Sequence, residues 1–476
     1  MTGLPSRQVK FTTKFGSLDE PYIRLDRRAW DDFGFQSLFE IILHAGNEAQ
    51  PLGSIKILQR GETRTELPQT FETLPETYCG LGQSLRYDRE VKRVEQEFAL
   101  DLSLALRDIR RLTNQQRTMF TGHPGFECSL IRFAPARLLY AYEFGDLAPT
   151  LDVDLRVDLP GFNAAHELKL EFDPDRLLGR VAVIIGENGT GKTRLLNEVA
   201  KAMSGVEPKW ISRGAPSVSR VIALSCNAFD QFEIPKPMIE DTYHYIGLRS
   251  KKDNIDVKGL GHAWGEVFRD GAPRRGHPRA DRFELWRDVL NDIGLGSLAE
   301  EDMLGSRRQE QAFERLGAGL KFACYVLTRL VQMVEPRSFV LFDEPETHTH
   351  PRLLSSMMRA LHRVLDNFES FALVATHSPL VVQEVPARQV HILRCFEDYP
   401  NFSPPLDETF GASLGELLRK TFLIDYHERN FDVLLHRLVE QHGAARVRVE
   451  LGDDLGLAAR LLLEKLDPGQ REGDVS

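Results

Sequence analysis

Residues 181 to 193 read Val-Ala-Val-Ile-Ile-Gly-Glu-Asn-Gly-Thr-Gly-Lys-Thr, and they say more about the architecture than any other segment. The first five form an unbroken apolar, mostly β-branched run, which is typical of a strand buried on both faces of a parallel sheet. The rest matches the pattern G-x-x-x-x-G-K-[ST]. A helix-like run, Arg194 to Met203, follows it. The stretch therefore predicts a strand, a tight glycine turn and a helix.

The residue types in this turn suit a polyphosphate. Glycines let consecutive backbone N–H groups face one anion, and the following helix adds its positive N-terminal dipole. Lys192 can reach the β- and γ-phosphates, and the Thr193 hydroxyl can hold Mg²⁺. ATP and Mg²⁺ are therefore the expected cofactors. The predicted nucleotide-binding residues are Gly186, Glu187, Asn188, Gly189, Thr190, Gly191, Lys192 and Thr193.

A second strand ends in paired carboxylates, and a third ends in a histidine. Ser338-Phe-Val-Leu-Phe-Asp-Glu-Pro-Glu346 predicts a strand that places Asp343 at its carboxyl end, where it can bind Mg²⁺. Glu344 can polarise the attacking water as a general base. His377 follows the apolar run 371–375 and can donate a hydrogen bond to the γ-phosphate. Glu344 and His377 are the predicted catalytic residues.

Strand and helix patterns alternate around these motifs. Their order predicts the α/β class: a mixed sheet with helices on both faces and an antiparallel β subdomain. Expected strands are 130–133, 151–157, 167–172, 181–185, 221–225, 339–342, 371–375 and 390–393; helical spacing is seen at 84–112, 316–334, 352–366 and 431–441. The expected domains are an N-terminal α+β domain at 1–125, a head at 126–425 with a loop-rich insertion at 204–283, and a C-terminal helical extension at 426–476.

Together these motifs resemble the head of an ABC-type ATPase. Residues 343–351, Asp-Glu-Pro-Glu-Thr-His-Thr-His-Pro, are similar to the D-E-P-E-x-x-L-H-P run of the OLD-like soluble ATPases of the AAA family. Those proteins recur in prokaryotic anti-phage systems, including the Septu type and retron-linked relatives. The resemblance covers about residues 150–425 and implies hydrolysis of ATP to ADP and phosphate. Transporter subunits usually carry S-A-L-D after the catalytic glutamate, so a transporter is disfavoured.

The resemblance also implies that two heads enclose two ATP molecules. Each site is then completed by an L-S-x-G loop from the other subunit. Here the matching segment is Leu316-Gly-Ala-Gly319, in which Gly317 stands where the family has serine. Loss of that hydroxyl removes a hydrogen bond to phosphate worth roughly 1.5–3 kcal/mol. Slow hydrolysis or a weakly held ATP-bound dimer is therefore expected. Gly317 and Gly319 are counted with the ATP site. The family's glutamine loop corresponds to Gln231 or Asn227.

Composition limits the partners. The 476 residues include 70 acidic and 60 basic side chains, a net charge of −10, so nucleic acid cannot be held by a uniformly basic surface. Residues 249–282 hold nine basic and five acidic side chains, which indicates either a solvated loop or a local contact with DNA or RNA. Five scattered cysteines form neither a disulfide framework nor a zinc pattern. Without a signal core or a membrane span, a cytoplasmic chain with no membrane contact is expected.

These observations predict an ATP-binding and ATP-hydrolysing component of a prokaryotic anti-phage defence system. As a homodimer or higher homo-oligomer, it would sense or regulate a partner effector, a nuclease or toxin. Alternatives are a RecF-like DNA-repair ATPase and an ATP-locked scaffold with negligible hydrolysis. Val449-Glu-Leu-Gly-Asp-Asp454 is followed by too few residues for a complete Toprim domain, so no intrinsic nuclease is expected.

Overall fold

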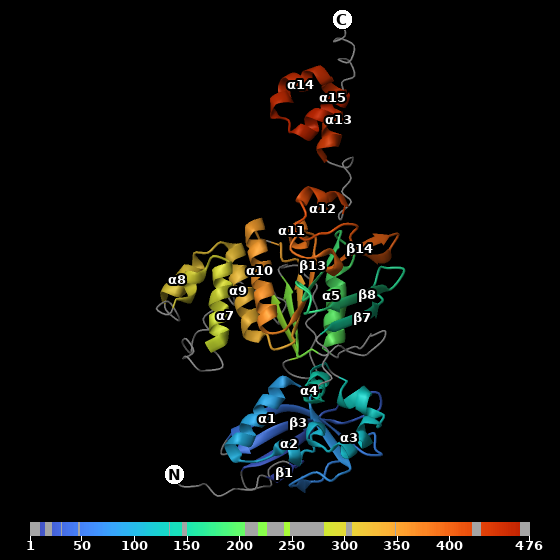
Figure 1. Ribbon diagram of the computed structural model, residues 1–476, viewed down its shortest axis with the longest axis vertical. Helices are drawn as coiled ribbons and strands as arrows, with labels where there is room; N and C mark the ends of the chain where they lie inside the picture. Colours follow the sequence, from blue (N-terminus) through green and yellow to red (C-terminus); the bar gives the residue numbers. More distant parts are fainter. Residues whose placement is uncertain are drawn as a thin grey trace.

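The computed structural model describes residues 10–14, 21–29, 31–45, 48–132, 134–144, 150–204, 218–225, 242–247, 280–300, 307–347, 349–420 and 430–466. Three units follow one another along the long axis of the molecule: an N-terminal unit (residues 10–144), a head (150–420) and a C-terminal bundle (430–466) (Figure 1). None of the helices in the described ranges combines the length and the apolar character needed to cross a membrane.

The N-terminal unit is built on one six-stranded sheet in the order β5-β1-β2-β3-β4-β6. Helix α1 covers it with a stripe that includes Tyr87, Val91 and Val94, all buried. The Ser84 side chain caps this helix by accepting from the Tyr87 N–H at 3.1 Å. The strands are β1 (Lys10–Thr12), β2 (Tyr22–Arg27), β3 (Leu38–Ala45), β4 (Glu48–Gln59), β5 (Thr70–Phe71) and β6 (Tyr78–Gly82); the helices are α1 (Leu85–Phe98), α2 (Leu102–Ala105), η1 (Ile109–Arg111), α3 (Asn114–Thr121), η2 (Phe126–Leu130) and α4 (Ala134–Phe144).

The structure corrects two sequence-based expectations for this region. Helical spacing runs on to 112, but α1 ends at Phe98 because Ala99 turns into the left-handed region at φ 51° and Asp101 caps a new helix. The strand expected at 130–133 is wrong: residues 126–130 form a π-helical turn. The apolar side chains of this turn, with those of α4, pack under β4 and β6. Residues 126–144 therefore lie with the N-terminal sheet.

The head contains a seven-stranded sheet in the order β11-β10-β12-β13-β9-β14-β15, parallel except for β15. A separate antiparallel hairpin, β7 with β8, shows the alternating burial of strands with one face on a core. The strands are β7 (Leu151–Val157), β8 (His166–Phe172), β9 (Val181–Gly186), β10 (Val221–Ser225), β11 (Tyr243–Gly247), β12 (Phe339–Asp343), β13 (Phe371–Thr376), β14 (Val390–Phe396) and β15 (Tyr399–Ser403).

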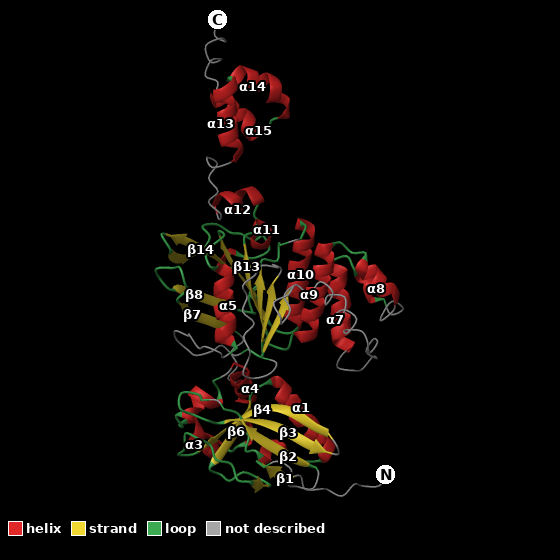
Figure 2. Cartoon of the chain, turned by 180° about the vertical axis from the view of Figure 1, so that it is seen from behind, coloured by secondary structure: helices red, strands yellow, loops and turns green. Residues whose placement is uncertain are grey.

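Helices cover both faces of this sheet. Along β9, Val183 and Ile185 face the core that α7, α9 and α10 close, while Ala182 and Ile184 face α5 and the β7–β8 hairpin (Figures 1 and 2). The predicted fold class, an α/β head with a mixed sheet and an antiparallel β subdomain, is confirmed. The helices are α5 (Lys192–Met203), α7 (Ala280–Asp292), η3 (Gly296–Ala299), α8 (Arg307–Glu314), α9 (Ala318–Met333), α10 (Pro351–Asn367), α11 (Pro379–Val382), η4 (Ala387–Gln389) and α12 (Leu414–Lys420).

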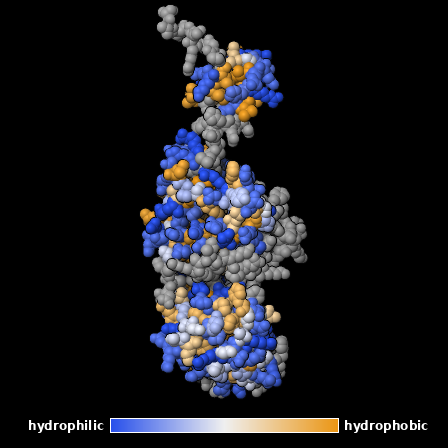
Figure 3. Space-filling view, turned by 90° about the vertical axis from the view of Figure 1, so that its right-hand side faces the viewer, coloured by the Kyte–Doolittle hydropathy of each residue, from blue (hydrophilic) through white to orange (hydrophobic). Residues whose placement is uncertain are grey.

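The C-terminal bundle contains α13 (Asn430–His442), α14 (Ala444–Leu451), η6 (Gly452–Asp454) and α15 (Leu457–Leu466). Its fully buried core is small and consists of Leu435, Val447 and Leu463. Several large apolar side chains lie on its surface instead, where Figure 3 shows apolar residues gathered on the bundle. These exposed side chains are Val433, Leu434, Val449, Leu457 and Leu461.

Candidate functional site

The phosphate loop joins β9 to α5, and its glycines are required by close contacts and by backbone angles. A Cβ on Gly186 would lie 2.5 Å from the Leu393 carbonyl oxygen, so no larger residue fits beside β14. Gly189 and Gly191 have φ of +85° and +92°. The α5 helix therefore begins without a side-chain cap, and its first N–H groups remain for an anion.

Lys192 places its ammonium across the mouth of the loop. Its side chain is buried, and Nζ donates to the Gly186 carbonyl at 2.8 Å and to the Glu187 carbonyl at 2.9 Å. Burial lowers the pKa of Lys192, while the nearby carboxylates of Glu344 and Asp343 counter that shift. An ammonium held in this way can exchange loop carbonyls for phosphate oxygens.

Asp343 and Thr193 meet at the carboxyl end of β12. The Thr193 hydroxyl donates to Asp343 Oδ2 at 2.8 Å, although the two residues come from different ends of the head sequence. Asp343 is only 1% exposed. A buried carboxylate beside a hydroxyl supplies the hard oxygen ligands that Mg²⁺ prefers. These two residues therefore fit a magnesium ion bound beside the phosphate loop.

Glu344 adopts an unusual backbone conformation. Its φ is +46°, in the left-handed region, and its N–H donates to the Ala375 carbonyl at 2.8 Å. Such a conformation costs a non-glycine residue of order 1–3 kcal/mol and is found most often at functional sites. The turn aims the Glu344 side chain, which is 20% exposed, toward His377, with Oε1 at 3.9 Å from Nδ1.

Strand order brings the histidine to the same place. β13 lies between β9 and β12, with Ala375 in register with both Ile184 and Asp343. The carboxyl ends of parallel strands meet at one edge of a sheet. His377, which comes directly after β13, therefore lies between the phosphate loop and Asp343. The structure thus groups Lys192, Thr193, Asp343, Glu344 and His377; their chemical roles stay predictions.

Glu346 is a site residue that sequence analysis had not singled out. Its Oε1 accepts from the Thr376 hydroxyl at 2.7 Å and from the His377 N–H at 2.7 Å, and it lies 3.0 Å from His377 Nδ1. The signal available in the sequence was the second carboxylate of the Asp-Glu-Pro-Glu run. By contrast, His350 of the same run caps α10, where Nδ1 accepts from the Arg352 N–H at 3.3 Å.

Two further residues lie against the phosphate loop from the β7–β8 connection. A Cβ on Gly191 would lie 3.2 Å from the Phe162 ring and 3.3 Å from His166 Nε2. The two rings meet edge to face at 4.7 Å, and His166 Nε2 is 3.4 Å from the Thr190 carbonyl. Nothing in the sequence pattern marks these residues, because only the fold brings the hairpin to the loop.

The structure does not bring the predicted signature segment to the loop of the same chain. Gly317 is the N-cap of α9 and, like Ala318, is exposed. Among described residues, nothing lies within 4 Å of a Cβ built on Gly317. Gly319 lies in the first turn of α9. The helix therefore presents an open N-terminus with no capping side chain.

Other predicted site residues lie outside the described ranges: Gln231, Asn227 and the basic segment up to Arg279. Arg282, the last residue of that segment, is described. Its guanidinium donates to the Val331 carbonyl at 2.8 Å, at the end of α9. That contact is structural, and the remaining basic residues of the predicted nucleic-acid segment lie outside the described ranges.

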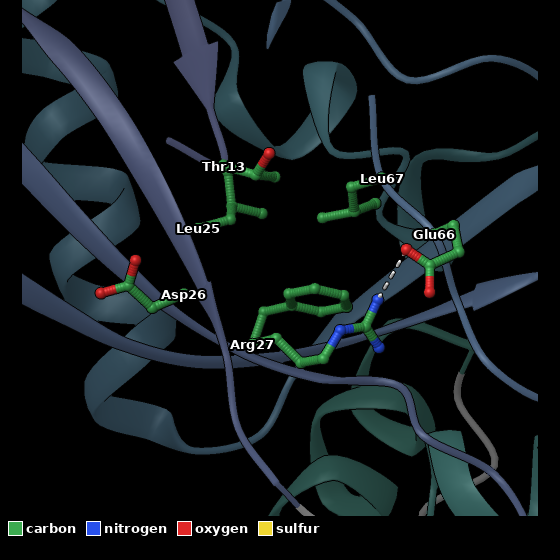
Figure 4. A pocket seen from close by; sticks show the side chains of 7 residues that line it. Thr13, Leu25, Asp26, Arg27, Glu66 and Leu67 are labelled. Carbon is green, nitrogen blue, oxygen red and sulfur yellow. Dashed lines mark ion pairs between the residues drawn. The ribbon is translucent and has the colours of Figure 1, made fainter. Parts of the chain in front are cut away.

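A cavity of about 390 Å³ lies in the N-terminal unit, and no phosphate-loop residue lines it. Figure 4 shows its wall, where the Arg27 guanidinium pairs with Glu66 at 3.5 Å. The guanidinium also stacks over Phe39 at 5.0 Å and donates to the Gln36 carbonyl at 3.2 Å. These contacts fix the wall of the cavity, which is separate from the site in the head.

Comparisons with known proteins agree with this geometry at a coarse level. Residues 204–383, which include Asp343, Glu344 and His377, match the family model described as "AAA domain, putative AbiEii toxin, Type IV TA system". Over 96% of both chains, the sequence is 27% identical to protein ea59 of Escherichia phage lambda.

Solved structures similar to the chain include ATP-binding cassettes. One is an ABC-transporter cassette in its ADP conformation, at 14% identity, 55% of this chain, 92% of that chain and a TM-score of 0.31. Another is cbiO1 from Clostridium perfringens, part of an ABC transporter complex, at 15% identity, 53% of this chain, 86% of that chain and a TM-score of 0.30. The phosphate loop, the strand order and the match of residues 204–383 to an AAA domain together support a P-loop ATPase head.

Proposed function

We propose that the protein binds MgATP at the grouped ends of β9, β12 and β13 and hydrolyses it. The single observation that carries this proposal is the contact between Thr193 and Asp343, at 2.8 Å beside the buried Lys192. It joins the phosphate loop to the acidic strand at the point where a magnesium ion must bridge protein and phosphate oxygens.

Each residue then has a defined task. Lys192 and the N–H groups of the loop hold the β- and γ-phosphates. Thr193 and Asp343 hold Mg²⁺, which neutralises charge on the phosphates. Glu344 accepts a proton from the attacking water, and His377 contacts the γ-phosphate. Phe162, against Gly191, is placed to contact the nucleotide beside the loop.

Dimerisation through ATP follows from the open N-terminus of α9. Gly317 and Ala318 are exposed, and no side-chain cap hydrogen bond is made at Gly317, the N-cap of α9. A second copy of the head can use the N–H groups at this N-terminus to contact the γ-phosphate. The ATP-bound assembly would be a homodimer or part of a higher homo-oligomer. Its ATP hydrolysis would be slow because Gly317 lacks a hydroxyl.

The biological role we propose is regulation of an effector in a prokaryotic defence system, in the cytoplasm. Support comes from the Asp-Glu-Pro-Glu run and from the toxin–antitoxin description of the matched family. A relative encoded by a phage is compatible with a system that a resident phage carries against its competitors. The effector, a nuclease or toxin, would be encoded nearby. Loss of protection in a plaque assay with Lys192→Ala tests this role.

Phosphate release tests hydrolysis itself. Glu344→Gln removes the proton acceptor while keeping the side-chain shape, so turnover should fall about 10²–10⁴-fold with ATP still bound. Glu384→Gln is a matched control, because in the described structure no hydrogen bond or ion pair joins this glutamate to the site. Equal turnover in Glu344→Gln and the parent would contradict the proposed base.

A scaffold locked by ATP is the second candidate, favoured by the bare cap at Gly317. It predicts ATP-dependent oligomers with almost no phosphate release. Gly317→Ser should then raise turnover, since the position has open space and an ordinary φ of −64°. An unchanged rate of phosphate release in Gly317→Ser would show that the missing hydroxyl does not limit hydrolysis. A RecF-like repair role would instead show turnover stimulated by DNA.

A further inference from the structure

Glu346 accepts two hydrogen bonds from the segment that carries His377 and lies close to its ring. Its Oε1 accepts from the Thr376 hydroxyl and from the His377 backbone N–H, both at 2.7 Å. The same oxygen lies 3.0 Å from Nδ1 of the His377 ring. The Glu346 side chain is only 11% exposed, whereas that of His377 is 47% exposed. A carboxylate in the turn after β12 thus holds the end of β13.

The contact with Nδ1 bears on which ring nitrogen carries hydrogen. A carboxylate offers only acceptors, so a carboxylate oxygen this close to Nδ1 favours the form with hydrogen on Nδ1. In the neutral ring, Nε2 then carries the lone pair; in the charged ring, both nitrogens donate. In both forms Glu346 occupies the Nδ1 side of the ring, which leaves Nε2 as the nitrogen for other contacts. Glu344 faces the same Nδ1, but from 3.9 Å.

A purely structural role explains this arrangement poorly. The backbone and hydroxyl donors alone would be satisfied by a neutral acceptor such as glutamine. Burying a carboxylate is costly unless it is fully paired, and within the described residues Glu346 Oε2 is buried without a hydrogen-bond partner. Thr376 also accepts from the Ser378 N–H at 2.9 Å, so the carboxylate controls the whole turn around the histidine.

We propose that Glu346 is a positioning residue that fixes the orientation and tautomer of His377 toward the γ-phosphate. The logic is that of a buried carboxylate orienting an imidazole in other enzymes. This inference rests on the proposed ATPase function, because it assigns a task to a residue of the same site.

Coupled substitutions test the dependence on His377. Glu346→Ala should lower kcat for ATP roughly 10–100-fold, with KM changed less than about threefold. On a His377→Ala background the same substitution should add less than about a twofold loss, since there is no ring left to position. Glu384→Gln again serves as the control carboxylate. A full additional loss in the double variant would mean that Glu346 acts independently of His377 and would overturn the proposal.

Nitrogen NMR of histidine-labelled protein separates this proposal from the proposed function. The His377 signal, identified by its absence in His377→Ala, should show hydrogen on Nδ1 in the parent and a shift toward Nε2–H in Glu346→Ala. Glu346→Gln, which keeps the acceptor oxygen, should retain more of the parent pattern. If the parent releases no phosphate but shows Nδ1–H, only the ATPase proposal fails; if it releases phosphate but shows Nε2–H, only the Glu346 proposal fails.

Discussion

At the scale of single residues, close packing explains why the phosphate loop needs glycine at positions 186 and 191. Gly186 lies against the Leu393 carbonyl, and Gly191 lies against Phe162 and His166 from another element. The hydrogen bond between Thr193 and Asp343 spans the loop and the acidic strand. Each contact comes from a different part of the chain, so the site is preorganised by the fold rather than by the motif alone.

Gly186→Ala should abolish tight ATP binding. The added Cβ would lie 2.5 Å from a backbone oxygen, which cannot move without displacing β14. We expect the affinity for MgATP, measured by calorimetry, to fall at least roughly tenfold, since a loop shift of this kind breaks several phosphate contacts. Gly415→Ala, with open space around it in α12, is the matched control and should bind normally. Parent-like affinity in Gly186→Ala would contradict the packing argument.

The sequence was sufficient to predict the residues whose identity is set by chemistry. Lys192, Asp343 and Glu344 could be recognised because phosphate, metal and water each demand one residue type at one spacing. Glu346 and Phe162 were missed because their roles depend on neighbours that only the fold supplies. Positioning residues carry no fixed spacing of their own.

At the scale of elements, strand order decides how the motifs meet. Each strand around the phosphate loop could be predicted from apolar runs, yet such runs do not state that β13 lies between β9 and β12. Local pattern also failed at 130–133, where Leu130 closes a π-helical turn under the N-terminal sheet and Ile131 and Arg132 lie outside any strand. Tertiary packing decided that element, because a buried helix and a buried strand need the same side chains.

β14 contains a histidine that makes the stability of the head depend on pH. Burial lowers the pKa of His391 from 6.5 to about 4. Between these values the unfolded chain binds the proton more readily, so stability falls as pH falls through this window. Between pH 7.5 and pH 5, the free energy of unfolding should decrease by about 2 kcal/mol less in His391→Gln than in the parent, as measured by urea unfolding. An identical pH dependence in variant and parent would contradict the assignment.

At the scale of the whole molecule, one buried carboxylate links the N-terminal unit to the head. Arg89 of α1 donates to Glu335 at 2.8 Å, and Arg282 lies 3.6 Å from the same oxygen. Arg220, 3.9 Å from that oxygen, also donates to the Met333 carbonyl at 2.7 Å. Glu335 follows α9, whose other end is the open N-terminus at Gly317, about 24 Å away along the helix. The junction therefore ties the N-terminal unit to the helix that begins at Gly317.

Glu335→Gln should weaken this link. The substitution leaves the buried Arg220 and the partly buried Arg282 without their counter-charge, so the free energy of unfolding of the head should fall by about 1–3 kcal/mol. Glu90→Gln, on the exposed side of α1, is the matched control and should change it by less than about 1 kcal/mol. Calorimetric unfolding of both variants gives the comparison; equal stability would show that the junction contributes little.

The most direct test of the central claim is the affinity for MgATP measured by calorimetry on Lys192→Ala. Lys201→Ala is the matched control, a lysine of the same helix that pairs with Glu198 at 3.0 Å, away from the loop. We predict that the parent and Lys201→Ala bind MgATP with equal affinity, while Lys192→Ala loses at least roughly tenfold. Parent-like binding by Lys192→Ala, or no binding by the parent, would contradict the assignment of this site.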